Sequence, residues 1–336
     1  MKTKGRLVNL VVTLLLAIAA ICVAVGGVLY ANSFEHERAA KKFGNGTRFS
    51  QITLFLPASA EFTADKIMYF RYNLENKLTE KSITPEKEGA RLYADAFSAF
   101  EEKTLYSNGK RSASAKVASI GGDYGLFHPA FAAMPNIGND INHDRILLSR
   151  SAAWQLYGGT ELYDYTVEID GETLCISGVY PDFEGDEYEE FYGLKVPAAR
   201  DILAQPETPV TCYELIVVDP VKNFAVDTVK ECLDLTEGTY LMVENSKRFS
   251  LSNLFRKIPK LVSADEPLPT GVDITPEEMA ARRAEKMLAV LLVIFLVLAV
   301  YPFVWLLILL YRLIRLVKKF FNRYVTGKIK DKLSYS

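Results

Sequence analysis

The sequence has few of the side chains that build metal centres and nucleophilic sites. Its 336 residues include three histidines, four cysteines and two tryptophans. His36, His128 and His143 do not fall at a metal-binding spacing such as H-E-x-x-H, and no G-x-x-x-x-G-K-[ST] phosphate-binding run is present. We therefore expect no metal site, no cofactor and no ATP binding by this chain alone. The sequence shows no catalytic residues, and we predict that the chain is not an enzyme.

The four cysteines do not form a disulfide framework. Cys22 lies inside a long apolar run, which leaves the odd set Cys175, Cys212 and Cys232. Cys175 is predicted to point inward from a strand, and free buried thiols are favoured for the set. A bond between Cys212 and Cys232 remains the alternative.

Acidic residues are scarce at each end of the chain. Residues 1–6 carry +3 and residues 312–336 carry +7, so the segment between them carries −12 of a total of −2. An acidic middle between basic ends argues against nucleic acid as a partner. The same pattern is typical of a membrane protein whose basic ends and acidic middle lie on opposite sides of the bilayer.

Two apolar runs are long enough to cross a bilayer. Residues 7–30 and 287–311 contain no charge, and about 20 residues suffice for a spanning helix. Pro302 predicts a kink in the second run. A cleaved signal peptide is the alternative for the first run, but its apolar stretch is longer than the usual core of such a peptide.

The positive-inside rule then predicts the topology. Residues 1–6 form a cytoplasmic N-terminus, and residues 312–336 form a basic cytoplasmic tail. Residues 31–286 form an extracytoplasmic domain with helical stalks, so the chain is a hairpin in the cell membrane with both termini in the cytoplasm.

The outer segment predicts an α+β fold. Strands are expected over residues 51–56, 92–106, 111–119, 145–148, 165–169, 173–179, 215–218 and 240–243, and helices over 63–81, 149–157 and 224–235. The turns Asn108-Gly109 and Asp170-Gly171 predict two hairpins. We expect two lobes, over about residues 47–185 and 190–262. Thr275, Pro276 and Glu278 predict a capping box that begins a helix continuous to about Lys319.

Two charged clusters are candidate contact sites. An acidic loop is a candidate for binding a partner or calcium, although a solvated loop is the simpler interpretation; its residues are Asp182, Glu184, Asp186, Glu187, Glu189 and Glu190. The basic tail is a candidate for contact with anionic lipid or a cytoplasmic protein, with lipid favoured; its residues include Arg312, Arg315, Lys318, Lys319, Phe320, Phe321 and Arg323.

One segment resembles a known family. Residues 145–182 fit a short strand, a helix with A-x-x-L-F/Y-G, and a G-x-x-V-x-I-x-G-x-x-x-x-V-x-G-V hairpin. The matching residues are Ala153, Leu156, Tyr157, Gly158, Val167, Ile169, Gly171, Ile176, Gly178 and Val179. This pattern is similar to the periplasmic core domain of MacB-type ABC transporter permeases. Asp164 stands near a position where the family has glycine, which is a departure.

The resemblance implies a two-lobed α+β domain and a non-catalytic role beside a separate ATPase. Those permeases have four spanning helices, whereas this chain has two apolar runs. We therefore expect a truncated, permease-like subunit that works with a separate ABC ATPase and permease subunit, with a homo-oligomer also open. The competing hypothesis is a free-standing module that binds or senses cell-envelope material, or regulates cell-wall enzymes. An outer-surface enzyme is the least favoured.

Overall fold

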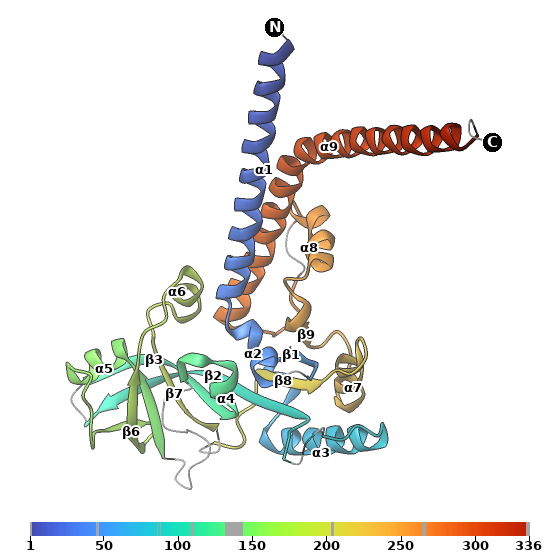
Figure 1. Ribbon diagram of the computed structural model, residues 1–336. Coiled ribbons are helices and arrows are strands. Elements are labelled where there is room, and N and C mark those ends of the chain that lie inside the picture. Colours follow the sequence, from blue (N-terminus) through green and yellow to red (C-terminus); the bar gives the residue numbers. More distant parts are fainter. Residues whose placement is uncertain are drawn as a thin grey trace. The chain divides into compact units, whose positions relative to one another are not determined.

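The computed structural model divides the chain into two compact units (Figure 1). The helical unit comprises residues 1–33, 254–262 and 285–336, and the sheet domain comprises residues 34–253 and 263–284. The structure describes residues 2–44, 47–85, 87, 89–108, 111–131, 144–202, 205–263 and 267–333.

The helical unit contains two helices that are long and apolar enough to cross a membrane. Helix α1 spans Lys2–Ser33 and helix α9 spans Pro276–Leu333, and their candidate spans are Val8–Ser33 and Pro276–Phe321. The two helices pack closely at Gly27, where an added Cβ would lie 3.8 Å from Leu288. Pro302 lies inside α9, and Figure 1 shows that this helix bends along its length.

Nine strands form the sheet domain. They are β1 Phe49–Phe55, β2 Tyr93–Ser107, β3 Arg111–Gly122, β4 Arg145–Ser149, β5 Thr166–Ile169, β6 Glu172–Tyr180, β7 Val196–Asp201, β8 Cys212–Val218 and β9 Leu241–Glu244. Their order is β3-β7-β4-β6-β5-β2-β8-β1-β9, and β3 also pairs with β2. Six strands therefore close into a ring, from which β8, β1 and β9 extend. The pairs β3–β7 and β4–β6 are parallel, and the others are antiparallel.

Short helices connect and cover these strands. They are η1 His36–Arg38, α2 Ala39–Phe43, η2 Ala58–Ala60, α3 Ala64–Glu80, α4 Tyr124–Phe127, η3 Pro129–Phe131, α5 Arg150–Tyr157, α6 Asp186–Tyr192, α7 Phe224–Cys232, η5 Asn245–Lys247, α8 Leu251–Lys257 and η6 Ile258–Lys260. The predicted α+β class agrees with this architecture.

The local signals explain why these elements form. Helix α3 buries four apolar residues that recur at helical spacing, namely Ile67, Phe70, Leu74 and Leu78. Ser149 accepts a hydrogen bond from the Ala152 amide and caps α5, and Gly158, with φ +77°, ends that helix. Asn108, with φ 39°, and Asp170, with φ 52°, supply the positive φ that the two hairpin turns need.

The cores divide the domain differently from the expected lobes. One hydrophobic cluster draws residues from 52–99 and 202–240, and a second cluster draws them from 105–198. The first lobe is therefore discontinuous in sequence, and the boundary expected near residues 185–200 does not match these clusters. The physical reason is the long β2–β3 hairpin, which passes from the first cluster into the second.

Three smaller expectations are corrected. Cys175 is exposed rather than inward, because β6 turns Leu174 and Ile176 to the core. Part of the predicted acidic loop, Asp186–Tyr192, is helix α6. Strand β7 was not expected at all. All four cysteines are free, as favoured, with Cys212 and Cys232 buried and Cys22 exposed.

Candidate functional site

A buried arginine joins the segments of the sheet domain that lead into the two long helices. Arg248 follows η5, and its side chain is 3% exposed. Its guanidinium donates to Glu37, just after α1, at 2.7 Å, and to both carboxylate oxygens of Glu278, in the first turn of α9, at 2.6 Å. We call these three residues the Arg248 cluster. One cation therefore holds both helix attachments to the residues that follow β9.

The Arg248 cluster changes the expected cap of α9. The Glu278 amide lies 3.5 Å from the Thr275 hydroxyl, as a capping box requires. The Glu278 carboxylate, however, binds Arg248 and Arg282. The predicted helix start is confirmed, but the reciprocal half of the box is replaced by ion pairs because a buried guanidinium lies within reach.

Two histidines meet a buried glutamate beside the Arg248 cluster. His128 Nε2 lies 2.7 Å from Glu214 Oε2, and His36 Nε2 lies 3.2 Å from Glu214 Oε1. The two imidazole rings are 4.8 Å apart, centroid to centroid, and Tyr124 stacks on His128. We call His36, His128 and Glu214 the histidine cluster. Their three ligand atoms all lie within 4.8 Å of one another.

Carboxylates control the electrostatics of the histidine cluster. Burial opposes the charged form of His36, but Glu214, Glu37 and Glu277 together outweigh burial and raise the pKa of His36. Burial also opposes the charged form of Glu214, but His128 and His36 overcome it and lower the pKa of Glu214. His36 and Glu214 therefore stabilise each other's ionised forms.

The acidic residues predicted as a partner site are partly paired within the chain. Asp182 accepts from the Ser151 amide at 3.0 Å and from its hydroxyl at 2.8 Å. Arg283 of α9 pairs with Glu187 at 3.1 Å and with Glu190 at 2.9 Å. Three of the six residues therefore have partners within the chain, and their role as a partner site stays a prediction. Glu184, Asp186 and Glu189 remain exposed to solvent.

The basic tail is part of α9. The residues from Arg312 to Phe321 are all exposed along this helix, including Arg315, Lys318, Lys319 and Phe320. Arg323 belongs to the same helix, but its side chain lies outside the described part, as does His143. Phe321 and Lys318 line a shallow hollow with Leu313, Ile314 and Val317. This helix thus carries both basic and large apolar side chains, as interfacial helices do.

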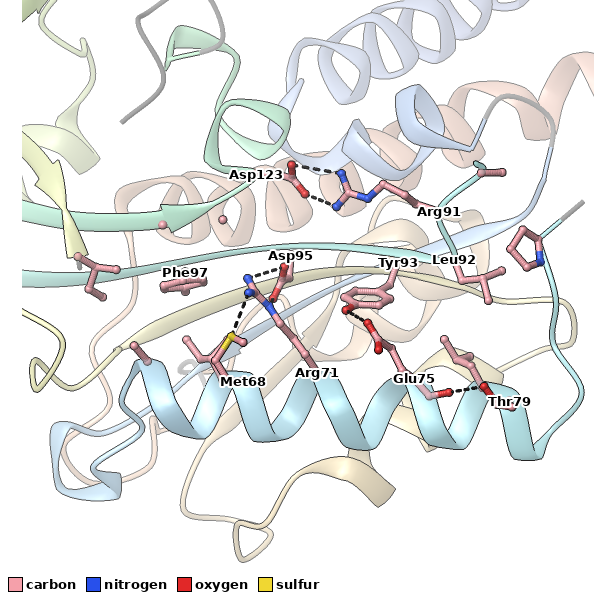
Figure 2. A pocket seen from close by; sticks show the side chains of 18 of the residues that line it. Met68, Arg71, Glu75, Thr79, Arg91, Leu92, Tyr93, Asp95, Phe97 and Asp123 are labelled. Atoms are coloured by element: carbon pink, nitrogen blue, oxygen red, sulfur yellow. Dashed lines mark hydrogen bonds and ion pairs between the residues drawn. The ribbon is translucent and has the colours of Figure 1, made fainter. Parts of the chain in front are cut away.

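A cavity of about 750 Å³ lies between α3 and the strand β2 (Figure 2). Arg71 reaches from α3 to the Asp95 carboxylate with bonds of 2.8 Å and 3.0 Å, and Tyr93 donates to Glu75 at 2.7 Å. Asp95 also accepts from the buried Tyr213 hydroxyl at 2.7 Å. The charged groups of this cavity are therefore paired across its walls. This arrangement suits a polar ligand that exchanges hydrogen bonds with the existing pairs.

The similarity to known proteins lies in the fold. No family model matches the chain, and no curated protein matches its sequence. One similar solved structure is the periplasmic region of MacB from Actinobacillus actinomycetemcomitans, at 11% identity and a TM-score of 0.39, covering 68% of this chain and 97% of that chain. A second is the extracellular domain of the noncanonic ABC-type transporter YknZ from Gram-positive bacteria, at 14% identity and a TM-score of 0.34. The match covers 58% of this chain and 100% of that chain. A third is a domain of a putative permease protein from Porphyromonas gingivalis, at 11% identity and a TM-score of 0.32. The match covers 60% of this chain and 89% of that chain.

These three solved structures are extracytoplasmic or permease domains, the kind of protein that the sequence resembles. The sheet domain itself contains both helices and a mixed sheet, and helices apolar enough to cross a membrane precede and follow it in the sequence.

Sequence reasoning missed both buried clusters. Glu37 and Arg248 are 211 positions apart, and His128 and Glu214 are 86 apart. His36 was assigned to a stalk, and His128 was set aside because no motif includes it. A usable signal was present in the composition, because two of only three histidines fall in the segment that leaves α1 and in a glycine- and aromatic-rich turn.

Proposed function

We propose that this chain is a non-catalytic membrane subunit of the permease type. Its sheet domain lies outside the cytoplasmic membrane and passes conformational change to partners through α1 and α9. Both termini lie in the cytoplasm. The partners are a separate ABC ATPase and a permease subunit, or a second copy of the chain.

The Arg248 cluster carries this proposal. A buried ion pair resists separation strongly, because removing one partner leaves an uncompensated charge. Arg248 holds Glu37 and Glu278 at once, and these residues begin the two segments that continue into the apolar helices. A movement of the chain after β9 therefore acts on both helix attachments together.

The distribution of charge supports the topology. The cations of residues 312–319 occupy an exposed helix with large apolar side chains, which suits the anionic inner surface of a membrane. The exposed carboxylates belong to the sheet domain. We propose that the tail contacts lipid headgroups, and that the spanning parts of α1 and α9 transmit the conformational change.

Affinity purification from native membranes in mild detergent tests the partner. We expect a tagged chain to recover a P-loop ATPase or a permease, and a control tag on an unrelated bitopic protein to recover neither. Repeated preparations that yield the chain with neither partner would count against the permease-type role.

A binding or sensing module is the second candidate, and the cavity beside α3 favours it. Met68, Tyr69 and Tyr72 project from α3 as exposed large apolar side chains. Aromatic and methionine side chains are enriched at recognition surfaces. A photo-crosslinking residue at Met68, which lines the cavity, is expected to capture an envelope component, whereas one at the exposed Tyr106 is the matched control. Equal capture at both positions would reject this candidate.

A further inference from the structure

In the histidine cluster, two hydrogen-bond acceptors face each other when His36 is neutral. His36 Nδ1 lies 3.0 Å from the Phe127 carbonyl oxygen. A carbonyl oxygen only accepts hydrogen bonds, so Nδ1 must carry the proton. In the neutral imidazole, Nε2 then has a lone pair, and it faces Glu214 Oε1, another acceptor, at 3.2 Å.

The buried Glu214 carboxylate has the same need for a donor or a cation. Glu214 is 1% exposed, and its Oε1 makes no hydrogen bond within the described residues. In that part of the chain, the ion pairs of Glu214 are with His36 and His128 alone. A buried carboxylate requires a cation or a donor, because burying an uncompensated charge is expensive. Either a proton on His36 or a metal ion meets this need.

The surroundings of His36 match those of a metal-binding histidine, and His128 has a carboxylate near its outer ring nitrogen. A metal-binding histidine characteristically donates its other ring N–H to a backbone carbonyl or carboxylate, which fixes the tautomer. His36 does so to Phe127, and His128 presents Nδ1 to Glu277 Oε1 at 3.8 Å. Both Nε2 atoms then point to the same carboxylate.

The spacing also fits a small dication. Zinc bonds of about 2.0–2.2 Å in tetrahedral geometry separate ligand atoms by about 3.4 Å. The separations here run from 2.7 Å to at most 4.8 Å and so bracket that value. Two imidazoles and one carboxylate suit zinc-type ions, whereas Mg²⁺ and Ca²⁺ prefer oxygen ligands throughout.

We propose that His36, His128 and Glu214 bind one divalent transition-metal ion of the zinc type, through both Nε2 atoms and the Glu214 carboxylate. The ion ties the segment after α1 to the end of α4 and to the central strand β8. This inference stands apart from the proposed function, since the site needs no partner subunit.

Zinc titration of the full chain tests the site. The protein is purified in detergent, stripped with a chelator and titrated with Zn²⁺ against a chromophoric competitor. A Cys175→Ser background removes the exposed thiol of the sheet domain. His36→Gln, His128→Gln and Glu214→Gln are compared with Glu189→Gln, which changes an exposed carboxylate.

We expect one Zn²⁺ per chain and a higher melting temperature with zinc. Each cluster variant is expected to weaken binding by more than about 100-fold, because loss of an outer partner alone costs about 10–100-fold. Glu189→Gln and Cys175→Ser are expected to bind as before, and Mg²⁺ not to compete.

The inference fails if the stripped wild type binds no zinc, if the three cluster variants bind as tightly as Glu189→Gln, or if Cys175→Ser abolishes binding. It also fails if the melting temperature responds to pH but not to zinc, since the cluster would then hold protons alone. Cobalt substitution of the wild type needs no variant to fold. Visible bands without a thiolate charge-transfer band are expected, and a thiolate band would overturn the assignment.

Discussion

Replacing Arg248 with methionine removes the cation shared by Glu37 and Glu278 and keeps most of the side-chain volume. Breaking a buried ion pair by deleting one partner costs about 3–5 kcal/mol of folding free energy. In the native chain Arg282 also binds Glu278, at 2.7 Å, and we expect this bond to persist in the variant. Glu37 is therefore the carboxylate that loses its guanidinium, and its Oε2 already lacks a hydrogen bond in the described structure.

Protonation of Glu37 limits this loss and makes it depend on pH. In the native chain burial raises the pKa of Glu37, and Arg248 and His36 offset this only in part. Protonating an ordinary glutamate costs about 1.36 kcal/mol for each pH unit above its pKa of about 4.3, which is about 3.7 kcal/mol at pH 7 and about 1 kcal/mol at pH 5. An acid with a raised folded pKa destabilises above its unfolded pKa, and the loss disappears as the pH falls towards that value.

Denaturant unfolding of the full chain in detergent, followed by circular dichroism, measures this effect. We expect Arg248→Met to lose about 3–4 kcal/mol near pH 7 and about 2–3 kcal/mol less near pH 5. Adding Glu37→Gln is expected to restore most of the loss. The exposed Arg256→Met is the matched control and should stay within about 0.5 kcal/mol of wild type.

A loss below about 1 kcal/mol near pH 7 would refute the importance of the Arg248 cluster, since buried pairs rarely break so cheaply. A loss that does not change with pH would refute the assignment of the unpaired charge to Glu37.

Three further predictions concern the sheet domain. Leu74→Ala, at a fully buried position, should cost about 2–5 kcal/mol in denaturant unfolding, whereas Tyr72→Ala, 62% exposed, should cost far less; equal losses would contradict the core assignment. Gly122→Ala should lower the melting temperature, because φ is +72° and the new Cβ would lie 2.5 Å from a backbone oxygen, while Gly159→Ala meets no atom within 4 Å. Because burial raises the pKa of Cys212, its thiol should resist a maleimide until the protein unfolds, and rapid native modification would argue against its burial.

Local signals in the sequence predicted most of the elements. Helix α3 follows from the spacing of its apolar residues, and helix α5 follows from the caps at Ser149 and Gly158, which act within a few residues. The β2–β3 and β5–β6 hairpins follow from turn residues for the same reason. Each of these signals acts where the chain is close to itself in sequence.

Strand β7 shows what local signals cannot give. It carries Pro197 and the buried charges Arg200 and Asp201, so its sequence does not read as a strand. Arg200 donates to Ser119 at 3.2 Å, a partner 81 positions away that no local signal indicates. The order of the strands is equally non-local, which is why the lobes were drawn as two continuous segments.

The candidate sites were the least predictable part. The acidic residues stood out in sequence, but Arg283 of α9 pairs with two of them across more than 90 positions. Arg248 sits in an ordinary basic stretch and gains its significance from burial between two distant carboxylates. The residues of the histidine cluster come from three elements that are distant in the sequence, so no motif spacing predicts that they meet.

Cys175 provides a native probe for the side of the membrane on which the sheet domain lies. Its thiol is exposed, whereas Cys212 and Cys232 are buried. A membrane-impermeant maleimide applied to intact cells, with Cys175→Ser as the control, is the most direct measurement. We expect wild type to be labelled without lysis and the serine variant to lose that labelling. Labelling of Cys175 that appears only after the cytoplasmic membrane is broken would place the domain inside the cell and contradict the proposed topology.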